Sequence, residues 1–364
     1  MSSSAAPPLF SLPKRYEYDN ETLGGGQGAV YICKDKLLDR LVAVKALHTM
    51  SNAASLSKEI EARAKIESKH VAEIYEVLHT SSGVPFALVL EYISGATLLE
   101  KTSHPPGTEA RLRLLYQLAC ALGDIHAANV IHRDIKPQNI KVDDGGILKI
   151  FDLGISNLDA DNASTLGGAG TLVFRAPELY AMKPLPVTRA VDIYAFGVIA
   201  WHILASALPQ CLIDLPPQNV LSPALPALAS LVPDLGAVAP LIDAALSVAP
   251  GARPPATEVR EALRRRLTQG RRRGLFASGQ QVWELQTTGK ITAFTVGSLG
   301  ALKVGYDGYN FVIREVTGSV FVNNTPAMVG YHFPDSCVLT FGAVALGSSR
   351  VFMSFNASQP EIVL

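Results

Sequence analysis

The residues best suited to chemistry lie between positions 132 and 154. This stretch begins with the run His-Arg-Asp-Ile-Lys-Pro-Gln-Asn at 132–139 and ends, after a short and mostly apolar run, with Asp-Leu-Gly. Asn139 and Asp152 supply a carboxamide and a carboxylate, whose oxygen atoms are ligands that hard cations such as Mg²⁺ prefer. Asp134 supplies a second carboxylate, which can accept the proton of a hydroxyl nucleophile. The stretch therefore combines a candidate cation site with a candidate proton acceptor.

A pair of short strands is needed to bring these groups together. Residues 140–142 and 147–151 are mostly apolar, and the Asp-Asp-Gly-Gly sequence at 143–146 between them is typical of a turn. A hairpin of this kind places Asn139 and Asp152 at neighbouring strand ends. The spacing therefore predicts that the two side chains share one hard cation.

This pattern resembles the catalytic loop and the metal-binding motif of the protein kinases. A lysine two places after the aspartate is similar to the serine/threonine branch of that family. The resemblance implies that Asp134 orients a substrate hydroxyl and accepts its proton, and that Lys136 neutralises the γ-phosphate. It also implies that Asn139 and Asp152 hold Mg²⁺ across the phosphates of ATP. Leu153 stands where the family usually has Phe, so a hydrophobic residue is kept there.

The chain before position 93 reads mainly as strands, which matches the small lobe of the kinase fold. The runs are rich in β-branched and aromatic residues, and one helix interrupts them. The predicted strands are 16–23, 29–34, 41–47, 71–79 and 85–92, and the predicted helix is 53–67.

A glycine-rich loop separates the first two of these strands. Glycine lets backbone N–H groups approach phosphate oxygens closely, whereas a bare hairpin turn is the alternative reading of such a cluster. The resemblance favours a phosphate loop, because Val-Ala-Val-Lys at 42–45 follows at the spacing of the family. Leu23 occupies the place of the first family glycine, so the loop has either lost that glycine or is one residue short. The nucleotide-binding residues implied here are Leu23, Gly24, Gly25, Gly26, Gly28, Val30 and Ala43.

Lys45 lies in an apolar predicted strand, where a buried ammonium group needs a partner. The resemblance implies that Lys45 binds the α- and β-phosphates and that Glu59, on the following helix, pairs with it. Glu61 is a rival partner by register. Arg63 stands where that helix usually has an apolar residue.

The run Phe-Ala-Leu-Val-Leu-Glu-Tyr-Ile at 86–93 resembles the strand and hinge behind the adenine of ATP. The resemblance implies that Leu90 guards the back of the pocket. It also implies that the backbone groups of Glu91 and Ile93 pair with the adenine edge. Ordinary strand residues are an equally consistent reading of these side chains.

Helical periodicity predicts a large lobe from about residue 94, with a helix over 109–128 that leads to the catalytic loop. Ala-Pro-Glu, ending at Glu178, resembles the end of the kinase activation segment. Arg253 stands where the family has the buried partner of that glutamate. The kinase resemblance covers residues 16–267.

The activation segment carries hydroxyl groups that a kinase can phosphorylate. In the kinases that this sequence resembles, an arginine at the place of Arg133 leaves a positive charge that a phosphate on the segment neutralises. We therefore expect autophosphorylation at Ser164 or Thr165. The alternative is that Asp159 or Asp161 supplies the negative charge permanently.

Two arginine triplets, 264–266 and 271–273, lie at the end of the predicted kinase domain and in the predicted linker 268–275. A solvated helix end followed by a linker is the plain reading of these charges. Docking to an acidic partner or to an anionic membrane surface is the alternative.

Residues 276–364 lack helical periodicity and contain short strand-like runs separated by Gly, Asn and Pro, which is typical of a small all-β sandwich. The sequences at 318–324 and 339–342 resemble the end of a forkhead-associated (FHA) domain. That family binds phosphothreonine peptides through Arg, Ser and His residues that we do not find here. We therefore expect an FHA-like domain that has lost its phosphate site and binds a protein partner. The predicted strands are 281–285, 291–296, 311–316, 320–322, 338–341 and 351–355.

Composition limits the classes of function. The 32 Lys and Arg residues balance the 32 Asp and Glu residues, so nothing indicates a nucleic-acid binder. The 4 cysteines show no Cys-x-x-Cys spacing, which argues against a zinc site or a disulfide framework and fits a reducing compartment. No apolar run reaches the roughly 18 residues of a membrane span. Residues 1–15 read as a disordered leader and not as a secretory signal, so we expect a cytoplasmic protein.

The predicted fold class is α+β, a bilobal protein kinase fold plus a small all-β sandwich domain. The predicted function is that of a serine/threonine protein kinase, which uses ATP and Mg²⁺ and acts on Ser or Thr hydroxyls of protein substrates. The alternative is a pseudokinase that serves as a scaffold or adaptor. The presence of Lys45, Asp134, Asn139 and Asp152 together favours the enzyme, because a scaffold has no chemical need for them.

Overall fold

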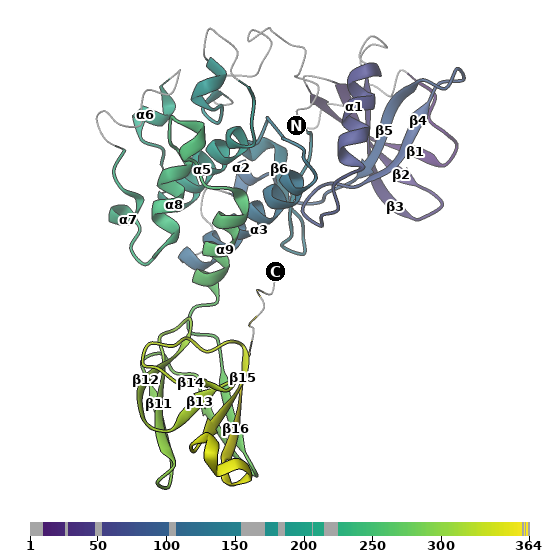
Figure 1. The fold of residues 1–364 in the computed structure, drawn as a ribbon. Coiled ribbons are helices and arrows are strands. Elements are labelled where there is room, and N and C mark those ends of the chain that lie inside the picture. Colours follow the sequence, from purple (N-terminus) through teal and green to yellow (C-terminus); the bar gives the residue numbers. More distant parts are fainter. Residues whose placement is uncertain are drawn as a thin grey trace. The chain divides into compact units, whose positions relative to one another are not determined.

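The structure is a computed structural model that describes residues 10–25, 28–47, 53–101, 107–153, 172–180, 186–205, 207–214, 225–358, 360 and 362. The chain divides between Leu263 and Arg264 into two compact units. They are called the N-terminal unit and the C-terminal unit below. Figure 1 shows the helices and strands of each unit, coloured along the sequence.

A five-stranded antiparallel sheet begins the N-terminal unit, with the strand order β1-β2-β3-β5-β4. Successive side chains in a strand point to opposite faces of the sheet. In β3, Val42 and Val44 join a core on one face, whereas Ala43 packs with Leu56 of helix α1 on the other. Lys45 follows Ala43 by two positions, so the same alternation directs its ammonium group toward α1. The strands are β1 (Tyr16–Gly25), β2 (Gly28–Asp35), β3 (Arg40–Leu47), β4 (Ile74–His79) and β5 (Pro85–Glu91), and the helix is α1 (Ala53–Arg63).

Two boundaries of the N-terminal unit differ by more than two residues from those that the sequence predicts. Helix α1 ends at Arg63 and not at residue 67, because the chain turns there with a hydrogen bond of 3.0 Å from the Ile66 N–H to the Arg63 carbonyl. Strand β4 begins at Ile74 and not at Val71, because Val71 forms a parallel bridge with Ile150 of the catalytic hairpin. The segment after α1 therefore connects the sheet to the catalytic region.

Residues 10–15, which the sequence predicts to lie in a leader, pack on the five-stranded sheet. The ring of Phe10 makes edge contacts with Tyr31 and Phe86, at centroid distances of 5.6 and 5.4 Å. Arg15 lies 2.7 Å from the buried carboxylate of Asp35. These contacts extend the folded part of the chain to before β1.

Helices make up most of the rest of the N-terminal unit (Figure 1). The apolar helix α5 is buried along almost its whole length and packs against α3 and α8. No helix in the described part of the chain is long and apolar enough to cross a membrane. The α-helices are α2 (Leu98–Lys101), α3 (Gly107–Ala127), α5 (Ala190–Ala205), α6 (Gln210–Ile213), α7 (Leu228–Leu231), α8 (Val238–Ala245) and α9 (Ala256–Leu267), and the 3-10 helices are η2 (Pro137–Asn139), η4 (Pro177–Tyr180) and η5 (Pro250–Ala252).

The predicted catalytic hairpin is present as β6 (Ile140–Val142) and β7 (Leu148–Ile150). Gln117 of α3 holds its turn and its second strand, because its amide nitrogen lies 3.0 Å from the Gly146 carbonyl and its amide oxygen 2.8 Å from the Leu148 N–H. The N–H of Ile150 donates to the carbonyl of His70 at 2.8 Å. The hairpin is therefore fixed by a helix of the large lobe and by the segment after α1.

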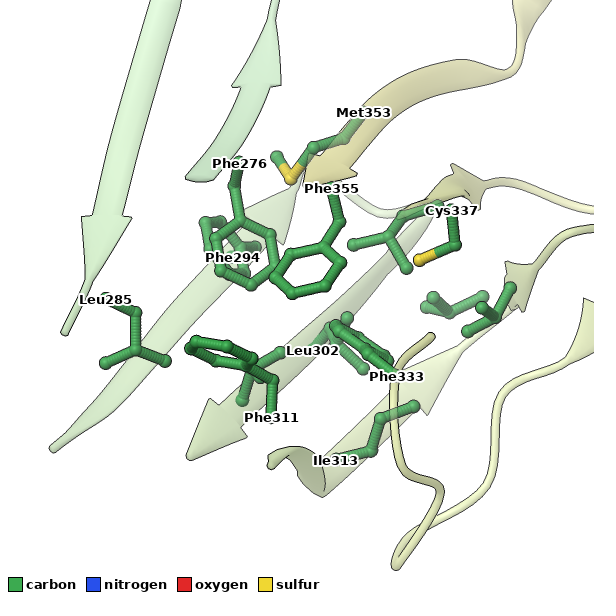
Figure 2. Close-up of a cluster of buried hydrophobic side chains, with 14 of the residues drawn as sticks. Phe276, Leu285, Phe294, Leu302, Phe311, Ile313, Phe333, Cys337, Met353 and Phe355 are labelled. Carbon is green, nitrogen blue, oxygen red and sulfur yellow. The ribbon is translucent and has the colours of Figure 1, made fainter. Parts of the chain in front are cut away.

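The C-terminal unit consists of a three-stranded and a six-stranded sheet around one core. Figure 2 shows the phenylalanine rings of this core. The ring centre of Phe276 in the larger sheet lies 4.5 Å from that of Phe294 in the smaller sheet. The ring centres of Phe355 in the larger sheet and Phe311 in the smaller sheet lie 5.2 Å apart. The smaller sheet is β10 (Ile291–Val296), β11 (Gly300–Tyr306) and β12 (Phe311–Gly318), and the larger is, in spatial order, β14 (Thr325–Pro326), β13 (Val320–Val322), β15 (Ser336–Phe341), β16 (Val351–Ala357), β8 (Gly274–Ser278) and β9 (Gln281–Leu285).

The Asn-Asn pair within the FHA-like sequence forms the turn between β13 and β14. Val322 pairs with Thr325, and Asn323 and Asn324 have φ angles of 46° and 64°. Two positive φ angles in a two-residue loop define a hairpin turn that asparagine adopts readily. The two asparagines of the FHA-like sequence are thus explained by the backbone conformation that this turn requires.

Arg272, within the predicted linker, belongs to the C-terminal unit. Its guanidinium donates to the carbonyl oxygens of Tyr309 at 3.0 Å and Ser358 at 3.3 Å, and it forms an ion pair with Asp335. It also lies 5.8 Å from the centre of the Phe311 ring. This arginine therefore ties the chain that enters β8 to the chain that leaves β16.

Candidate active site

The catalytic loop at 132–139 ends in η2, which leads directly into β6. The side-chain nitrogen of Asn139 lies 2.9 Å from both the backbone oxygen and Oδ2 of Asp134. The ammonium of Lys136 lies 2.8 Å from the same Oδ2. Both described side-chain contacts of the Asp134 carboxylate use Oδ2, which leaves Oδ1 as the oxygen that can face a hydroxyl group.

Asp192 of α5 holds the start of this loop. Its buried carboxylate accepts hydrogen bonds from the backbone N–H groups of His132 at 2.9 Å and Arg133 at 2.8 Å, and it lies 2.9 Å from Nε2 of His126. Arg133 has a φ of 68°, a left-handed conformation that a residue other than glycine rarely adopts. The two N–H contacts stabilise that conformation and so fix the orientation of the backbone at the next residue, Asp134.

Lys45 connects α1 to the chain that follows β7. Its Nζ atom lies 3.3 Å from each carboxylate oxygen of Glu59 and forms an ion pair with Oδ1 of Asp152. The structure therefore brings Lys45 to Glu59, whereas Glu61 is exposed. The side chain of Glu59 is only 4% exposed but that of Asp152 is 41% exposed, so of the two carboxylates Asp152 is the one that a ligand from solvent can reach.

The surroundings keep Asp152 ionised. Burial opposes its ionisation, but the charge of Lys45 and its hydrogen bond outweigh burial, with smaller contributions from Arg63 and His132. The pKa of Asp152 is therefore held below its ordinary value. The residue after it, Leu153, is 1% exposed and takes the buried place that the sequence predicts for a hydrophobic residue.

The glycine-rich loop is the tip of the hairpin between β1 and β2. Gly25 pairs with Gly28, Gly24 with Ala29, and Leu23 with Val30. Leu23 is thus a paired strand residue, and Gly24 and Gly25 are the last two paired residues of β1. Gly26, the remaining predicted phosphate-loop residue, lies outside the described residues, as do Gly154, Ser164 and Thr165.

The predicted hinge follows β5, and two lysines of the catalytic hairpin contact it. Lys149 of β7 lies 2.6 Å from Oε1 of Glu91, and the ammonium of Lys141 in β6 donates to the Ile93 carbonyl at 3.1 Å. Ala43 pairs with Leu90 in the sheet, so these residues lie on adjacent strands. The hinge is therefore attached to the hairpin that carries Asn139.

The sequence interpretation assigned no role to these two lysines, although the sequence contained a signal for them. Lys141 and Lys149 are paired directly across the hairpin. Like charges in such a cross-strand pair repel each other, so each ammonium group needs an acceptor elsewhere. Glu91 and the carbonyl of Ile93 supply these acceptors.

The activation-segment motif is anchored as the sequence interpretation expects. Arg253 and Glu178 form a buried pair with two parallel contacts of 2.7 Å, and the arginine also donates to the carbonyls of Ala190 and Ser247, both at 2.8 Å. The arginine side chain is fully buried. Its charge and its N–H groups are therefore satisfied by one carboxylate and three backbone oxygens, the third being that of Val248 at 3.5 Å.

The donor set fits a divalent cation and a polyphosphate. Asp152 is an ionised and accessible carboxylate, and the two described hydrogen bonds of the Asn139 side chain are made by its nitrogen, which leaves the amide oxygen for a cation. No cluster of three or more His, Cys, Asp or Glu residues suited to a metal occurs among the described residues. A cation held by one carboxylate and one amide must therefore share its remaining positions with water or phosphate, as Mg²⁺ commonly does.

Comparison with known proteins identifies the class that this fold and this site define. The family described as the protein kinase domain matches residues 18–219, which is more than half of the chain. The chain belongs to this family.

Its relatives among curated proteins are also kinases by name. A probable serine/threonine-protein kinase of Clostridium acetobutylicum is 33% identical over 209 residues, which is 54% of this chain and 31% of that protein. A serine/threonine-protein kinase of Myxococcus xanthus is 33% identical over 229 residues, 60% of this chain and 27% of that protein. One of Corynebacterium efficiens is 36% identical over 198 residues, 51% of this chain and 38% of that protein. The chain thus spans roughly a third of the length of these relatives.

Proposed function

We propose that this protein is an ATP-dependent serine/threonine protein kinase. The observation that carries the proposal is the contact of Lys45 with both Glu59 and Asp152. It joins the helix of the small lobe to the metal-binding motif of the large lobe, next to the loop that holds Asp134. Phosphoryl transfer relies on positioning and on charge neutralisation, and this arrangement offers both.

Asp134 is the residue that orients the substrate hydroxyl and accepts its proton. Asn139 and Lys136 hold one of its carboxylate oxygens at 2.9 and 2.8 Å, which leaves the other oxygen for the hydroxyl. The ammonium of Lys136 places positive charge beside the point at which negative charge develops on the nucleophile and the phosphoryl group. The lysine therefore supports the proton transfer and the phosphate at once.

ATP supplies the γ-phosphoryl group when it is bound, and Mg²⁺ neutralises part of its charge. Asn139 and Asp152 are the residues that hold the cation. Lys45 would bind the α- and β-phosphates with Glu59 as its support, and the backbone of Gly24, Gly25 and Gly28 would lie against the phosphates. The backbone groups of Glu91 and Ile93 bind the adenine edge.

We also propose that the C-terminal unit is an FHA-like β sandwich that serves as a protein-interaction module. Two sheets around one phenylalanine-rich core and the Asn-Asn turn after β13 support this reading. Protein substrates with Ser or Thr, autophosphorylation at Ser164 or Thr165, and a cytoplasmic location complete the proposal.

The full chain incubated with labelled ATP, Mg²⁺ and a generic basic substrate protein tests the enzymatic proposal. We expect label on serine or threonine of the substrate, and none with Lys45→Met. Lys65→Met, which removes an exposed ammonium just beyond α1, is the matched control and retains activity. Folded wild-type protein that binds ATP but transfers no phosphate would instead support the pseudokinase alternative.

A further inference from the structure

Arg63, the last residue of α1, is buried although arginine is almost always exposed. Its side chain is 2% exposed, and its Nε atom lies 3.2 Å from Oε1 of Glu59, one helical turn before it. Its Nη1 atom donates to the Ala72 carbonyl at 3.2 Å. Arg63 therefore contacts Glu59, the partner of Lys45, and the side chain of Glu59 stands between Arg63 and Lys45.

From these contacts we infer that Arg63 is a positioning residue for Lys45 in phosphoryl transfer, an inference that rests on the proposed kinase activity. Lys45 stands between two carboxylates, those of Glu59 and Asp152, and one ammonium group cannot neutralise both. Arg63 adds the second positive charge at Glu59. The four side chains then form an alternating row in which positive and negative charges balance.

The distances agree with a shared Glu59. Charge-assisted contacts between nitrogen and oxygen are typically about 2.7–2.9 Å long. Lys45 lies 3.3 Å from both oxygens of Glu59, and Arg63 lies 3.2 Å from one of them. Arg63 neutralises part of the negative charge of Glu59. The ammonium group of Lys45 can therefore also interact with Asp152 and with the phosphates.

Arg63 also links α1 to the strand that precedes Asp152. It donates to the carbonyl of Ala72, and the N–H of Ala72 donates to the carbonyl of Ile150 in β7 at 2.9 Å. The helix that carries Glu59 and the strand that leads to Asp152 are therefore connected through a single residue of the intervening segment. This connection fixes the position of Glu59 relative to Asp152.

Stability alone is a poor reason for a buried arginine here. Replacing buried charges by apolar groups of similar volume is often neutral or stabilising. The Nη2 atom of Arg63 is buried and has no hydrogen-bond partner among the described residues, so part of its desolvation cost is not offset. A buried charge of this kind that contacts Glu59 points to a role in the reaction.

Steady-state kinetics of four variants of the full chain test the inference. Arg63→Met keeps the volume and removes the charge, whereas Arg63→Lys keeps the charge without the guanidinium fork that reaches Ala72. Glu59→Gln and the double variant Glu59→Gln/Arg63→Met complete a double-mutant cycle. Coupled residues lose additivity in such a cycle. We expect Arg63→Met to lower kcat about tenfold and Arg63→Lys about threefold, with the KM for the protein substrate within about twofold of wild type. In the Glu59→Gln background the effect of Arg63→Met falls below about twofold.

Lys65→Met and Glu61→Gln, at exposed positions of the same region, are the matched controls and leave kcat unchanged. Additive effects of Arg63→Met and Glu59→Gln, or a wild-type kcat in Arg63→Met, would overturn the inference. Thermal unfolding measured on each variant separates loss of fold from loss of position. If Arg63→Met does not fold, Arg63→Lys in the two Glu59 backgrounds provides the same comparison.

Hydrogen exchange of the α1 amides separates this inference from the proposed function. We expect exchange about tenfold faster in Arg63→Met than in Lys65→Met, since only the former loses the contact with Ala72. An inactive wild-type protein in which Arg63→Met still accelerates exchange would reject the kinase activity but retain the positioning role. Equal exchange in the two variants would reject the positioning role itself.

Discussion

Asp134 uses a single carboxylate oxygen for both of its described side-chain contacts, with Asn139 and Lys136. A carboxamide at this position keeps the shape of the side chain but cannot accept a proton from a hydroxyl group. The residue can therefore be tested without disturbing the loop, because Asp192 holds the loop through backbone contacts that Asp134 does not share.

Asp134→Asn is expected to lower kcat by about 10²–10⁴-fold, the range that general acid–base groups contribute. Transfer of label from ATP to a substrate protein measures this loss. Asp144→Asn, in the exposed turn of the catalytic hairpin, is the control and keeps wild-type activity. A kcat within threefold of wild type in Asp134→Asn would contradict the assigned role.

Asp152→Asn removes the charged oxygen that we assign to Mg²⁺ and also one partner of Lys45. We expect a large loss of activity that rising Mg²⁺ partly restores, because the remaining oxygens still bind the cation weakly. Activity measured across a series of Mg²⁺ concentrations shows this as a shift of the midpoint. Asp134→Asn should leave that midpoint unchanged, and an unshifted midpoint in Asp152→Asn would exclude it as a cation ligand.

At the scale of elements, buried ion pairs fix the segments that surround the site. Arg253 joins η4 to the region after α8 through the carboxylate of Glu178, and Arg15 joins the segment before β1 to Asp35 at the end of β2. In both pairs the carboxylate is buried, so the loss of the arginine removes its nearest cation, although Asp35 keeps a longer contact of 3.8 Å with Arg40. These contacts determine stability without touching any reacting group.

Arg253→Met is expected to destabilise the N-terminal unit by about 3–5 kcal/mol, the cost of leaving Glu178 buried without its partner. Urea unfolding measures the change. Arg189→Met, at an exposed arginine whose contact is with Asn129, should change stability by less than about 0.5 kcal/mol. The double variant with Glu178→Met recovers part of the loss, and a double variant as unstable as the single one would contradict this explanation.

The pair of Arg15 and Asp35 predicts a dependence of stability on pH. The hydrogen bond from Arg15, opposed by burial and aided by the N–H groups of Leu37 and Leu38, lowers the pKa of Asp35 to about 2. An unfolded aspartate has a pKa of about 4. The ionised form therefore stabilises the fold above about pH 4, and this stabilisation is lost as the pH falls through about 2.

Thermal unfolding of wild type and Asp35→Asn at several pH values checks this dependence. We expect Asp35→Asn to unfold at a lower temperature at pH 7 and the difference to shrink as the pH approaches 2. A difference that stays constant from pH 7 to pH 2 would show that the ionisation of Asp35 contributes nothing.

Elements with a regular pattern were predictable from the sequence, whereas contacts between distant segments were predictable only where the kinase resemblance implied them, as for Arg253 and Glu178. The Asp-Asp-Gly-Gly turn predicted the hairpin of β6 and β7, and the pairing of Lys45 with Glu59 was implied by the kinase resemblance. The predicted end of α1 was wrong, because the N–H groups of Lys65 and Ile66 form three-residue turns to Ala62 and Arg63 in place of helical bonds, and residues 70–72 then bond to Ile150 of β7. The lysines at the hinge were missed for the same kind of reason, since their acceptors come from a different lobe.

At the scale of the whole molecule, the chain combines a kinase domain with an all-β unit that has its own core. Phe276, Phe311 and Phe355 are almost fully buried within the C-terminal unit (Figure 2). A core of this kind indicates a unit that can be tested for ligands of its own. The resemblance to an FHA domain suggests which ligands to compare.

The C-terminal unit is expected to bind protein partners without depending on phosphothreonine, because the sequence pattern does not match the Arg, Ser and His ligands of the FHA family. Titration of the full chain carrying Lys45→Met, which cannot phosphorylate the peptides, with phosphorylated and plain threonine peptides measures the preference. Equal affinities agree with the expectation. A preference of more than about tenfold for the phosphorylated set, lost when residues from 274 onward are deleted, would refute it.

The pairing of β8 with β16 has a consequence for how this unit can be rearranged. Gly274 lies opposite Ala357, so the first strand of the unit begins beside the end of its last strand. Neighbouring ends are what circular permutation requires, and Gly279 lies in an open turn between β8 and β9 with no atom near the position of a side chain. A short linker between the ends near Gly274 and Ala357, with the chain opened at Gly279, would keep the strand order of both sheets. Because either pair of ends is adjacent, the unit is also suited to insertion into a loop of another protein.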